Sequence, residues 1–232
     1  MGILEILYPA RCPICHGILK GRDGICPECI KKLPYIIEPK CKKCGKQMES
    51  AEEEYCRDCK RFSHAFDRGA AVYTYNDVMA RSIAMFKYHN RREYAKVYAK
   101  EMYRCCSRFL KSCAPEVILP VPIHRQKKRQ RGFNQAELVA KELGKLLNVP
   151  VDADYLIRKA KTIPQKELTR QQRKRNLKEA FEVSKDGKYY KRVLLIDDIY
   201  TTGATMDAVS EILRENQTKI IFFLTICVGR NS

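Results

Sequence analysis

Residues 193–205, Val-Leu-Leu-Ile-Asp-Asp-Ile-Tyr-Thr-Thr-Gly-Ala-Thr, join a short apolar run to two adjacent acids and a turn of small residues. The apolar run is continuous and rich in β-forming residues, which predicts a buried parallel strand that ends where Asp197 and Asp198 emerge. Open parallel sheets bind their ligands at this carboxyl end. Hydroxyls and backbone N–H groups of residues 201–205 then open a predicted helix, whose N-terminus attracts anions.

The order of these parts indicates the kind of ligand. A dinucleotide-binding sequence places glycines directly after the strand and its ribose-binding acid about 20 residues later, whereas here the acids come first. This order suits a compact sugar phosphate, with Mg²⁺ nearby if the ligand carries a pyrophosphate. The alternative, a strand-turn-helix with a solvated acidic tip, is disfavoured because adjacent carboxylates on a buried strand are costly. The predicted ligand-binding residues are Asp197, Asp198, Thr201, Thr202, Gly203, Ala204 and Thr205.

Eight of the 12 cysteines form four Cys-x-x-Cys pairs near the N-terminus. The pairs are Cys12/Cys15, Cys26/Cys29, Cys41/Cys44 and Cys56/Cys59. Their repetition as two similar units predicts two structural Zn²⁺ ions in Cys₄ ribbons, with sequential pairing preferred over an interleaved arrangement. A disulfide framework is the rival interpretation, but it belongs to secreted chains and no signal peptide is visible. Because residues 1–66 hold few large aliphatic side chains, zinc would supply their folding free energy.

The chain is strongly basic, since 45 Lys and Arg residues against 27 Asp and Glu residues give a formal net charge of +18 over 232 residues. Such an excess predicts a polyanionic partner. The positive charge is concentrated in residues 125–131 and 158–178. No apolar run approaches the roughly 20 residues that span a bilayer. The candidate contacts to nucleic-acid phosphates are Lys127, Lys128, Arg129, Arg170, Arg173 and Lys174.

Strands and helices are predicted to alternate between the cysteines and the C-terminus. Strands are expected at 69–75, 117–121 and 220–228, and helices at 77–86 and 92–111. A further helix begins after Asn134, with Glu137 completing a variant of the capping box. This alternation predicts an α/β fold with a parallel sheet and flanking helices. We therefore expect a double zinc-ribbon domain over residues 1–66 and an α/β domain over residues 67–232.

With these elements placed, the chain resembles the ComF family, in which a double zinc ribbon precedes a type I phosphoribosyltransferase fold. The motif Asp-Asp-x-x-Thr-Thr-Gly is shared by many enzymes that bind phosphoribosyl pyrophosphate (PRPP). Its combination with Arg-Gly-Phe-Asn-Gln and the cysteine pairs is much more specific. The marks, in family order, are the eight paired cysteines, Phe86-Lys87-Tyr88, Pro120-Val121-Pro122, Arg131-Gly132-Phe133-Asn134-Gln135 and residues 197–205.

The resemblance implies a protein that handles incoming single-stranded DNA in naturally transformable bacteria, together with other DNA-import proteins. Its expected location is the cytoplasm, at most peripheral to the inner face of the membrane. The resemblance also implies that PRPP lies between the acidic loop and a pyrophosphate loop at 121–131, with Mg²⁺ on the pyrophosphate. The expected catalytic contacts to the pyrophosphate are Arg131, Arg125 and Lys87. The basic segment 158–178 is expected to close over the site.

The acceptor of a phosphoribosyl group is not specified by any motif, although residues 76–115 are a candidate hood for it. Two hypotheses of function therefore stay open. In the first, the protein handles DNA and uses its PRPP site as a ligand switch. In the second, it is an active phosphoribosyltransferase that transfers phosphoribose to a nucleobase or nitrogen nucleophile outside competence. Release of pyrophosphate across a panel of bases separates the two.

Overall fold

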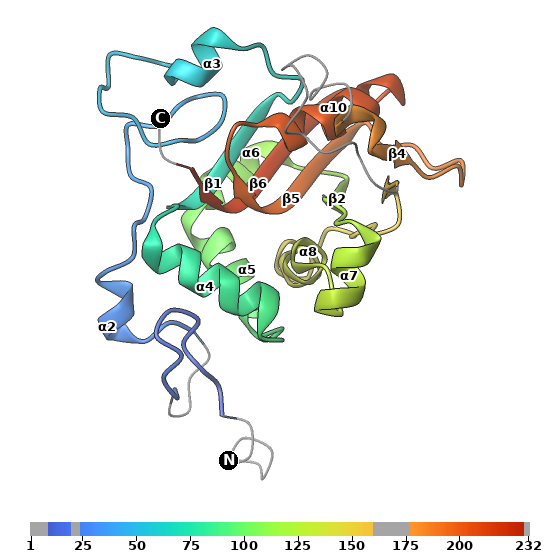
Figure 1. Ribbon diagram of the computed structural model, residues 1–232. Coiled ribbons are helices and arrows are strands. Elements are labelled where there is room, and N and C mark those ends of the chain that lie inside the picture. The colour runs from blue at the N-terminus through green and yellow to red at the C-terminus, as the bar shows by residue number, and fades with distance from the viewer. Residues whose placement is uncertain (1–8, 20–23, 160–176, 230–232) are drawn as a thin grey trace, which may run out of the picture.

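The computed structural model describes residues 9–19, 24–159 and 177–229, and its centre is a parallel β-sheet (Figure 1). The sheet has four strands in the order β1-β6-β5-β2, all parallel to their neighbours. Its strands are β1 (Arg68–Thr74), β2 (Val117–Pro120), β5 (Arg192–Tyr200) and β6 (Ile220–Val228). A separate antiparallel pair consists of β3 (Leu156–Arg158) and β4 (Phe181–Val183).

Helices cover both faces of the sheet, which explains why its two central strands are almost continuously apolar. Leu194 and Ile196 of β5 belong to a core shared with α4, α5 and α8. Val193 and Leu195 point the other way and pack with α10 and the second cysteine unit. The described helices are α2 (Pro27–Ile30), α3 (Arg57–Arg61), α4 (Asp77–Tyr88), α5 (Tyr94–Cys105), α6 (Ser107–Cys113), α7 (Arg125–Arg131), α8 (Gln135–Leu147) and α10 (Ala204–Glu215).

The two cysteine units lie on opposite faces of the sheet. In the first unit, the carbonyl of Pro13 accepts a hydrogen bond from Ser82 on α4, and His16 Nδ1 lies 2.8 Å from the hydroxyl of Tyr94 on α5. The second unit contributes Cys41, Cys44 and Cys56 to the core under α10. Between the units, the chain runs along the edge of β1, where the backbone N–H of Ile36 donates to the carbonyl of Val72 at 3.0 Å. Both units are therefore packed against the α/β core.

The structure confirms the parallel α/β core and differs from the sequence prediction in its details. The helix expected at 92–111 is two helices, because Cys106 leaves the helical conformation at φ −111° and ψ 22°. Strand β5 continues past Ile196 to Tyr200, since it stays paired with β6 as far as Val228. The short pair β3 and β4 was not expected. No helix within the described residues is both long and apolar enough to cross a membrane.

Candidate functional site

The two acids of the candidate site lie on β5 and face opposite sides of the sheet, because side chains alternate along a strand. Asp198 shares the face of α4, where its Oδ2 lies 2.7 Å from the Nζ of Lys87. Both side chains of this pair are mostly buried, at 17% and 15% exposed for Lys87 and Asp198. Asp197 faces the other side, and its Oδ1 accepts a hydrogen bond from the backbone N–H of Asp198 at 2.8 Å.

The protonation of Asp197 reflects its surroundings. Burial and the neighbouring charge of Asp198 raise the pKa of Asp197 to about 7, although the backbone N–H of Asp198, Lys87 and Arg158 act in the opposite direction. Burial lowers the pKa of Arg158 on β3, and the charge of Asp197 offsets this effect only in part. Neighbouring carboxylates repel each other, which favours a proton on one of the two acids. A cation or a hydroxyl donor brought by a ligand would favour the charged form instead.

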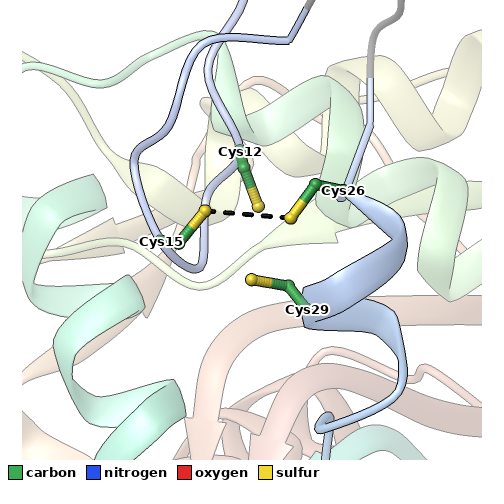
Figure 2. A group of neighbouring side chains, drawn as sticks. All are labelled: Cys12, Cys15, Cys26 and Cys29. Carbon is green, nitrogen blue, oxygen red and sulfur yellow. Dashed lines mark hydrogen bonds between the residues drawn. The ribbon is translucent and has the colours of Figure 1, made fainter.

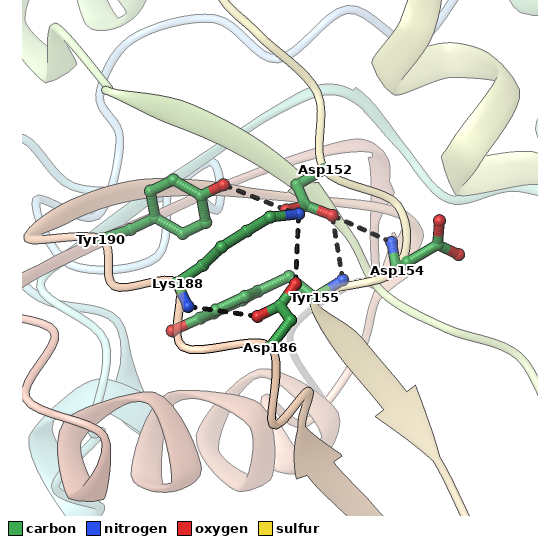
Figure 3. A network of polar contacts seen from close by, with 6 residues as sticks. All are labelled: Asp152, Asp154, Tyr155, Asp186, Lys188 and Tyr190. Carbon is green, nitrogen blue, oxygen red and sulfur yellow. Dashed lines mark hydrogen bonds and ion pairs between the residues drawn. The ribbon is translucent and has the colours of Figure 1, made fainter.

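A network of polar contacts surrounds Asp152, in the segment before β3 (Figure 3). The Asp152 carboxylate accepts hydrogen bonds from Lys188 Nζ at 2.9 Å and from the hydroxyl of Tyr190 at 3.0 Å. It also accepts from the backbone N–H of Tyr155, at the start of the turn into β3. The network therefore fixes the segment before β5 against the segment before β3. Sequence reasoning did not single it out, because its members are spread over 38 positions.

The loop between β5 and α10 provides no side-chain cap for the backbone N–H groups at the start of α10. Gly203 precedes α10 with φ at +83°, a backbone conformation that favours glycine, and the helix start has no side-chain capping hydrogen bond. The first N–H groups of a helix need partners, so this end of α10 suits an anion. Thr201, Thr202 and Ala204 are exposed beside it, and Thr205 is half-buried.

The segment expected to be a pyrophosphate loop, residues 121–131, is a helix over most of its length. The expectation of a loop was wrong because α7 consists of Arg, Gln and Lys, which favour a helix but carry no apolar stripe to reveal it. His124 caps this helix, accepting from the backbone N–H of Gln126 at 3.2 Å. Arg131 is the last residue of this helix and precedes Gly132, whose φ is positive.

Arg131 is anchored between two helices. Its guanidinium donates to Gln135 Oε1 on α8 and to the hydroxyl of Tyr88 at the end of α4, both at 3.1 Å. Within the described residues, Arg131 Nε, Gln135 Nε2 and His124 Nε2 are buried without a hydrogen-bond partner. An unpaired buried polar group costs about 1–3 kcal/mol, so these nitrogens are suited to an additional hydrogen-bond partner. Oxygen atoms of an anion or of water fit this description.

The structure brings some of the predicted site residues into contact and leaves others apart. Lys87 joins Asp198, and the next residue of α4, Tyr88, joins Arg131, so α4 links the acids to α7. Arg125, Lys127 and Arg129 are exposed on α7, and Lys128 lies 3.5 Å from Glu137 on α8. The remaining candidates, Arg170, Arg173 and Lys174, lie outside the described residues. Tyr88, His124 and Gln135 were not predicted as contacts to PRPP, whereas Arg158 begins the basic segment that was expected to close over the site.

The eight paired cysteines form two groups in sequential order, and the side chains of the first group converge on a common centre (Figure 2). Within each group, all four sulfur atoms lie within 4.8 Å of one another. Cys15 and Cys26 are 3.8 Å apart, and Cys44 and Cys56 are 3.6 Å apart, measured between sulfurs. Four thiolates at about 2.3 Å from a tetrahedral zinc would be about 3.8 Å from each other. Both tetracysteine sites therefore fit a structural Zn²⁺.

Comparisons with known proteins agree with this architecture. Residues 3–60 match the family model of the double zinc ribbon domain. The chain is 31% identical over 211 residues to Competence protein F of Haemophilus influenzae, covering 88% of this chain and 91% of that protein. It is 30% identical over 207 residues to Competence protein ComFC of Bacillus subtilis, with 85% and 81% covered. To DNA utilization protein YhgH of Escherichia coli it is 26% identical over 228 residues, with 96% and 98% covered.

Among solved structures, the chain is similar to a purine phosphoribosyltransferase from Pyrococcus horikoshii, at 16% identity and a TM-score of 0.37 over 56% of this chain and 73% of that one. The chain itself is an α/β protein of the parallel-sheet type that carries a double zinc ribbon. The extent of its likeness to Competence protein F and ComFC shows, more narrowly, that it belongs to the ComF family.

Proposed function

We propose that the protein binds PRPP with Mg²⁺ at the edge formed by β5, α10 and α7, and that it acts in the uptake and handling of single-stranded DNA. Relatives along most of the chain are named for competence and for DNA utilization, which supports the second part. The observation that carries the first part is the contact of Lys87 with Asp198 beside an uncapped helix N-terminus. A cation, two carboxylates and anion-binding N–H groups therefore lie near the carboxyl end of β5.

Each part of PRPP has a matching group at this edge. The 5-phosphate would accept hydrogen bonds from the loop Thr201–Thr205 and the first turn of α10. The ribose hydroxyls would donate to Asp197 and Asp198. The pyrophosphate would take the donors that are buried without partners at the α7–α8 edge, Arg131 Nε and Gln135 Nε2 among them. Arg125, at the first turn of α7, is the remaining candidate contact to it.

Lys87 contacts Asp198 at the position where a ribose hydroxyl of PRPP would bind. In the structure its ammonium neutralises Asp198, so the charge of this buried acid is paired before any ligand arrives. A ribose hydroxyl at Asp198 would release Lys87 toward the pyrophosphate, which needs positive charge as the C1–O bond weakens. Mg²⁺ suits the same position, because it prefers carboxylate and phosphate oxygens and would neutralise the pyrophosphate charge.

Single-stranded DNA would contact the exposed face of α7. Lys127, Lys128 and Arg129 lie on this helix, whose last residue is the pyrophosphate candidate Arg131. Phosphate contacts from such residues are independent of base sequence, which suits imported DNA. The strand and PRPP would then share one helix, so that one ligand can influence the other. Arg170, Arg173 and Lys174 are proposed as further contacts, although they lie outside the described residues.

The place of action and the domain division remain parts of the proposal. Zinc-binding thiolates persist in a reducing compartment, which supports the cytoplasm, with DNA-import proteins at the inner face of the membrane as partners. We keep a boundary between residues 66 and 67, where the second cysteine unit gives way to β1.

The test is the effect of PRPP on DNA binding. Fluorescently labelled single strands are titrated with the protein in the presence and absence of saturating PRPP and Mg²⁺, and pyrophosphate release is followed with a panel of bases. A change in strand affinity without pyrophosphate release supports the ligand-switch proposal. Rapid release with one base would favour the active transferase. The absence of both PRPP binding and strand binding at low salt would contradict the proposal.

A further inference from the structure

The segment that leaves the second cysteine unit is clamped onto α10, next to the proposed phosphate loop. His64 Nδ1 lies 2.8 Å from Asp207 Oδ2, and the backbone N–H of Ala65 donates to Asp207 Oδ1 at 3.0 Å. Asp207 belongs to the first turn of α10. At the other end of that helix, Arg214 lies 2.7 Å from the carboxylate of Asp67. The segment His64–Asp67 therefore holds α10 at both ends.

His64 also packs behind the turn that shapes the loop. A Cβ atom added to Gly203 would lie 3.1 Å from His64 Cε1 and 2.7 Å from the hydroxyl of Tyr200. Residue 203 must therefore be glycine for its close approach to these two rings as well as for its positive φ. The imidazole is 2% exposed. The ring therefore packs directly against the backbone at Gly203, on the core side of the loop.

A continuous series of contacts leads from His64 back to the cysteine unit. The His64 ring stacks on Phe66, with 4.8 Å between centroids and an interplanar angle of 19°. Lys43, which lies between Cys41 and Cys44 in the sequence, places its ammonium 5.3 Å from the Phe66 ring centre. The carbonyl of Lys43 accepts from the backbone N–H of Gly69 at 2.7 Å. These contacts connect the second cysteine unit to the residues behind the loop.

The first cysteine unit has a histidine of its own that lies elsewhere. His16 contacts Tyr94 of α5, on the opposite face of the sheet from α10. Variants of His16 therefore serve as matched controls for variants of His64.

We infer that the second zinc ribbon is a structural part of the phosphate-binding loop, with His64 as the positioning residue that joins them. Zinc at Cys41, Cys44, Cys56 and Cys59 and a phosphate at the loop then bind cooperatively, whereas zinc at the first site does not take part. This inference rests on the proposed function, because it concerns the same loop. It adds a role in ligand affinity for a unit whose zinc was expected only to supply folding free energy.

Two amide substitutions separate the two ring nitrogens of His64. The side-chain nitrogen of asparagine can take the position of Nδ1, and that of glutamine the position of Nε2. Only Nδ1 has a partner, since Nε2 is buried without a hydrogen bond among the described residues. His64→Asn should thus keep the contact to Asp207, and His64→Gln should lose it.

The first measurement is calorimetric titration with ribose 5-phosphate, which carries the phosphate and hydroxyls without the pyrophosphate. His64→Asn should bind within about twofold of the wild type, and His64→Gln about tenfold more weakly, as expected for a lost hydrogen bond to a charged group. His16→Gln should bind like the wild type. Equal binding by wild type and His64→Gln, with both carrying two zinc ions, would overturn the inference and leave the proposed function intact.

The second measurement tests the reciprocal effect, which linkage requires to be of equal size. Zinc is titrated against a chelating indicator at equilibrium, with and without saturating ribose 5-phosphate. One of the two zinc ions should be held more tightly with the sugar phosphate in the wild type and in His64→Asn, and not in His64→Gln. Unchanged affinity for both ions in a protein that binds the sugar phosphate would overturn the inference. Absence of any ribose 5-phosphate binding by the wild type would overturn it together with the proposed function.

Discussion

The ammonium of Lys87 lies 2.7 Å from the carboxylate of Asp198, so the end of α4 is tied to the carboxyl end of β5. The two residues are 111 positions apart and meet because α4 packs on the face of the sheet toward which Asp198 points. A mostly buried ion pair of this kind contributes little net stability, since desolvation opposes the attraction. A functional role for the lysine at the proposed PRPP site would explain its presence better.

Replacing Lys87 by glutamine should show whether this residue contacts the pyrophosphate of PRPP or only supports the ribose-binding acids. If Lys87 moves to the pyrophosphate, affinity for PRPP should fall about tenfold, the size expected for one charge-assisted contact, while affinity for ribose 5-phosphate stays nearly unchanged. Competitive titration of the two ligands measures this difference. Lys100→Gln, an exposed change on α5, is the matched control. An equal loss for both ligands would show that Lys87 only shapes the acid site.

The raised pKa of Asp197 predicts a dependence of stability on pH. The folded protein holds this proton up to about pH 7, whereas an unfolded aspartate releases it near pH 4. Between these values the folded state binds more protons, so the free energy of unfolding falls as pH rises. Asp197→Asn removes this contribution and should be more stable than the wild type at pH 8, with a smaller difference at pH 5. Urea denaturation at both values measures it, and an unchanged difference would contradict the assigned pKa.

Single-stranded DNA should bind with a strong dependence on salt and little dependence on sequence. The logarithm of the affinity should fall by about 0.7 per contacted phosphate for each tenfold rise in salt concentration. Replacing Lys127, Lys128 and Arg129 by alanine should reduce this slope by about two to three contacts. Fluorescence anisotropy over a salt series gives the slope. If the triple variant keeps the wild-type slope, α7 does not contact the strand.

The cysteine groups predict separate zinc sites. The purified protein should carry two zinc ions. Cys41→Ser should lower the zinc affinity of the second group only, because the four sulfur atoms of each group lie within 4.8 Å of one another and form a separate site. Metal analysis after dialysis against a weak chelator measures this loss. Cys12→Ser provides the reciprocal control for the first group. Loss of both ions from either single variant would contradict independent sites.

Asn134 should be important for stability through two hydrogen bonds. Its Oδ1 accepts from the backbone N–H of Ala136 at 3.1 Å, and its Nδ2 donates to the carbonyl of Val121 at 3.0 Å. The side chain thereby caps α8 and ties it to the end of β2. Asn134→Ala should lower the free energy of unfolding by about 2 kcal/mol, combining a lost cap with an unpaired carbonyl. Asn148→Ala, at the other end of α8, is a poor control because that residue has positive φ, so Lys141→Ala on the exposed face serves instead.

Local patterns were sufficient to predict the parts of this protein whose structure depends on neighbours in sequence. The strand before Asp197, the helix that follows Gly203 and the cap at Asn134 each follow from a few adjacent residues. Predicted strand limits of 69–75 and 220–228 lie within one residue of those observed. Glu137 was expected to complete the capping box, but it pairs with Lys141 at 2.7 Å instead.

Features that depend on tertiary packing were not predictable in the same way. No local pattern marks the break at Cys106, and α7 lacks the apolar stripe by which a packed helix is recognised. His64 carries no motif, and its role follows only from the chain passing behind Gly203 in space. Lys87 was chosen through the family resemblance, and its pairing with Asp198 required the three-dimensional arrangement of α4 and β5.

The central claim, a PRPP site at the acidic edge, is tested most directly by titrating PRPP with Mg²⁺ into the wild type and into the double variant Asp197→Asn, Asp198→Asn. Asp77→Asn, an exposed carboxylate change in the first turn of α4, is the control. Both variants should be folded, with two zinc ions each. The account predicts saturable binding by the wild type and the control, and no detectable binding by the double variant. Wild-type affinity in a folded double variant would contradict it.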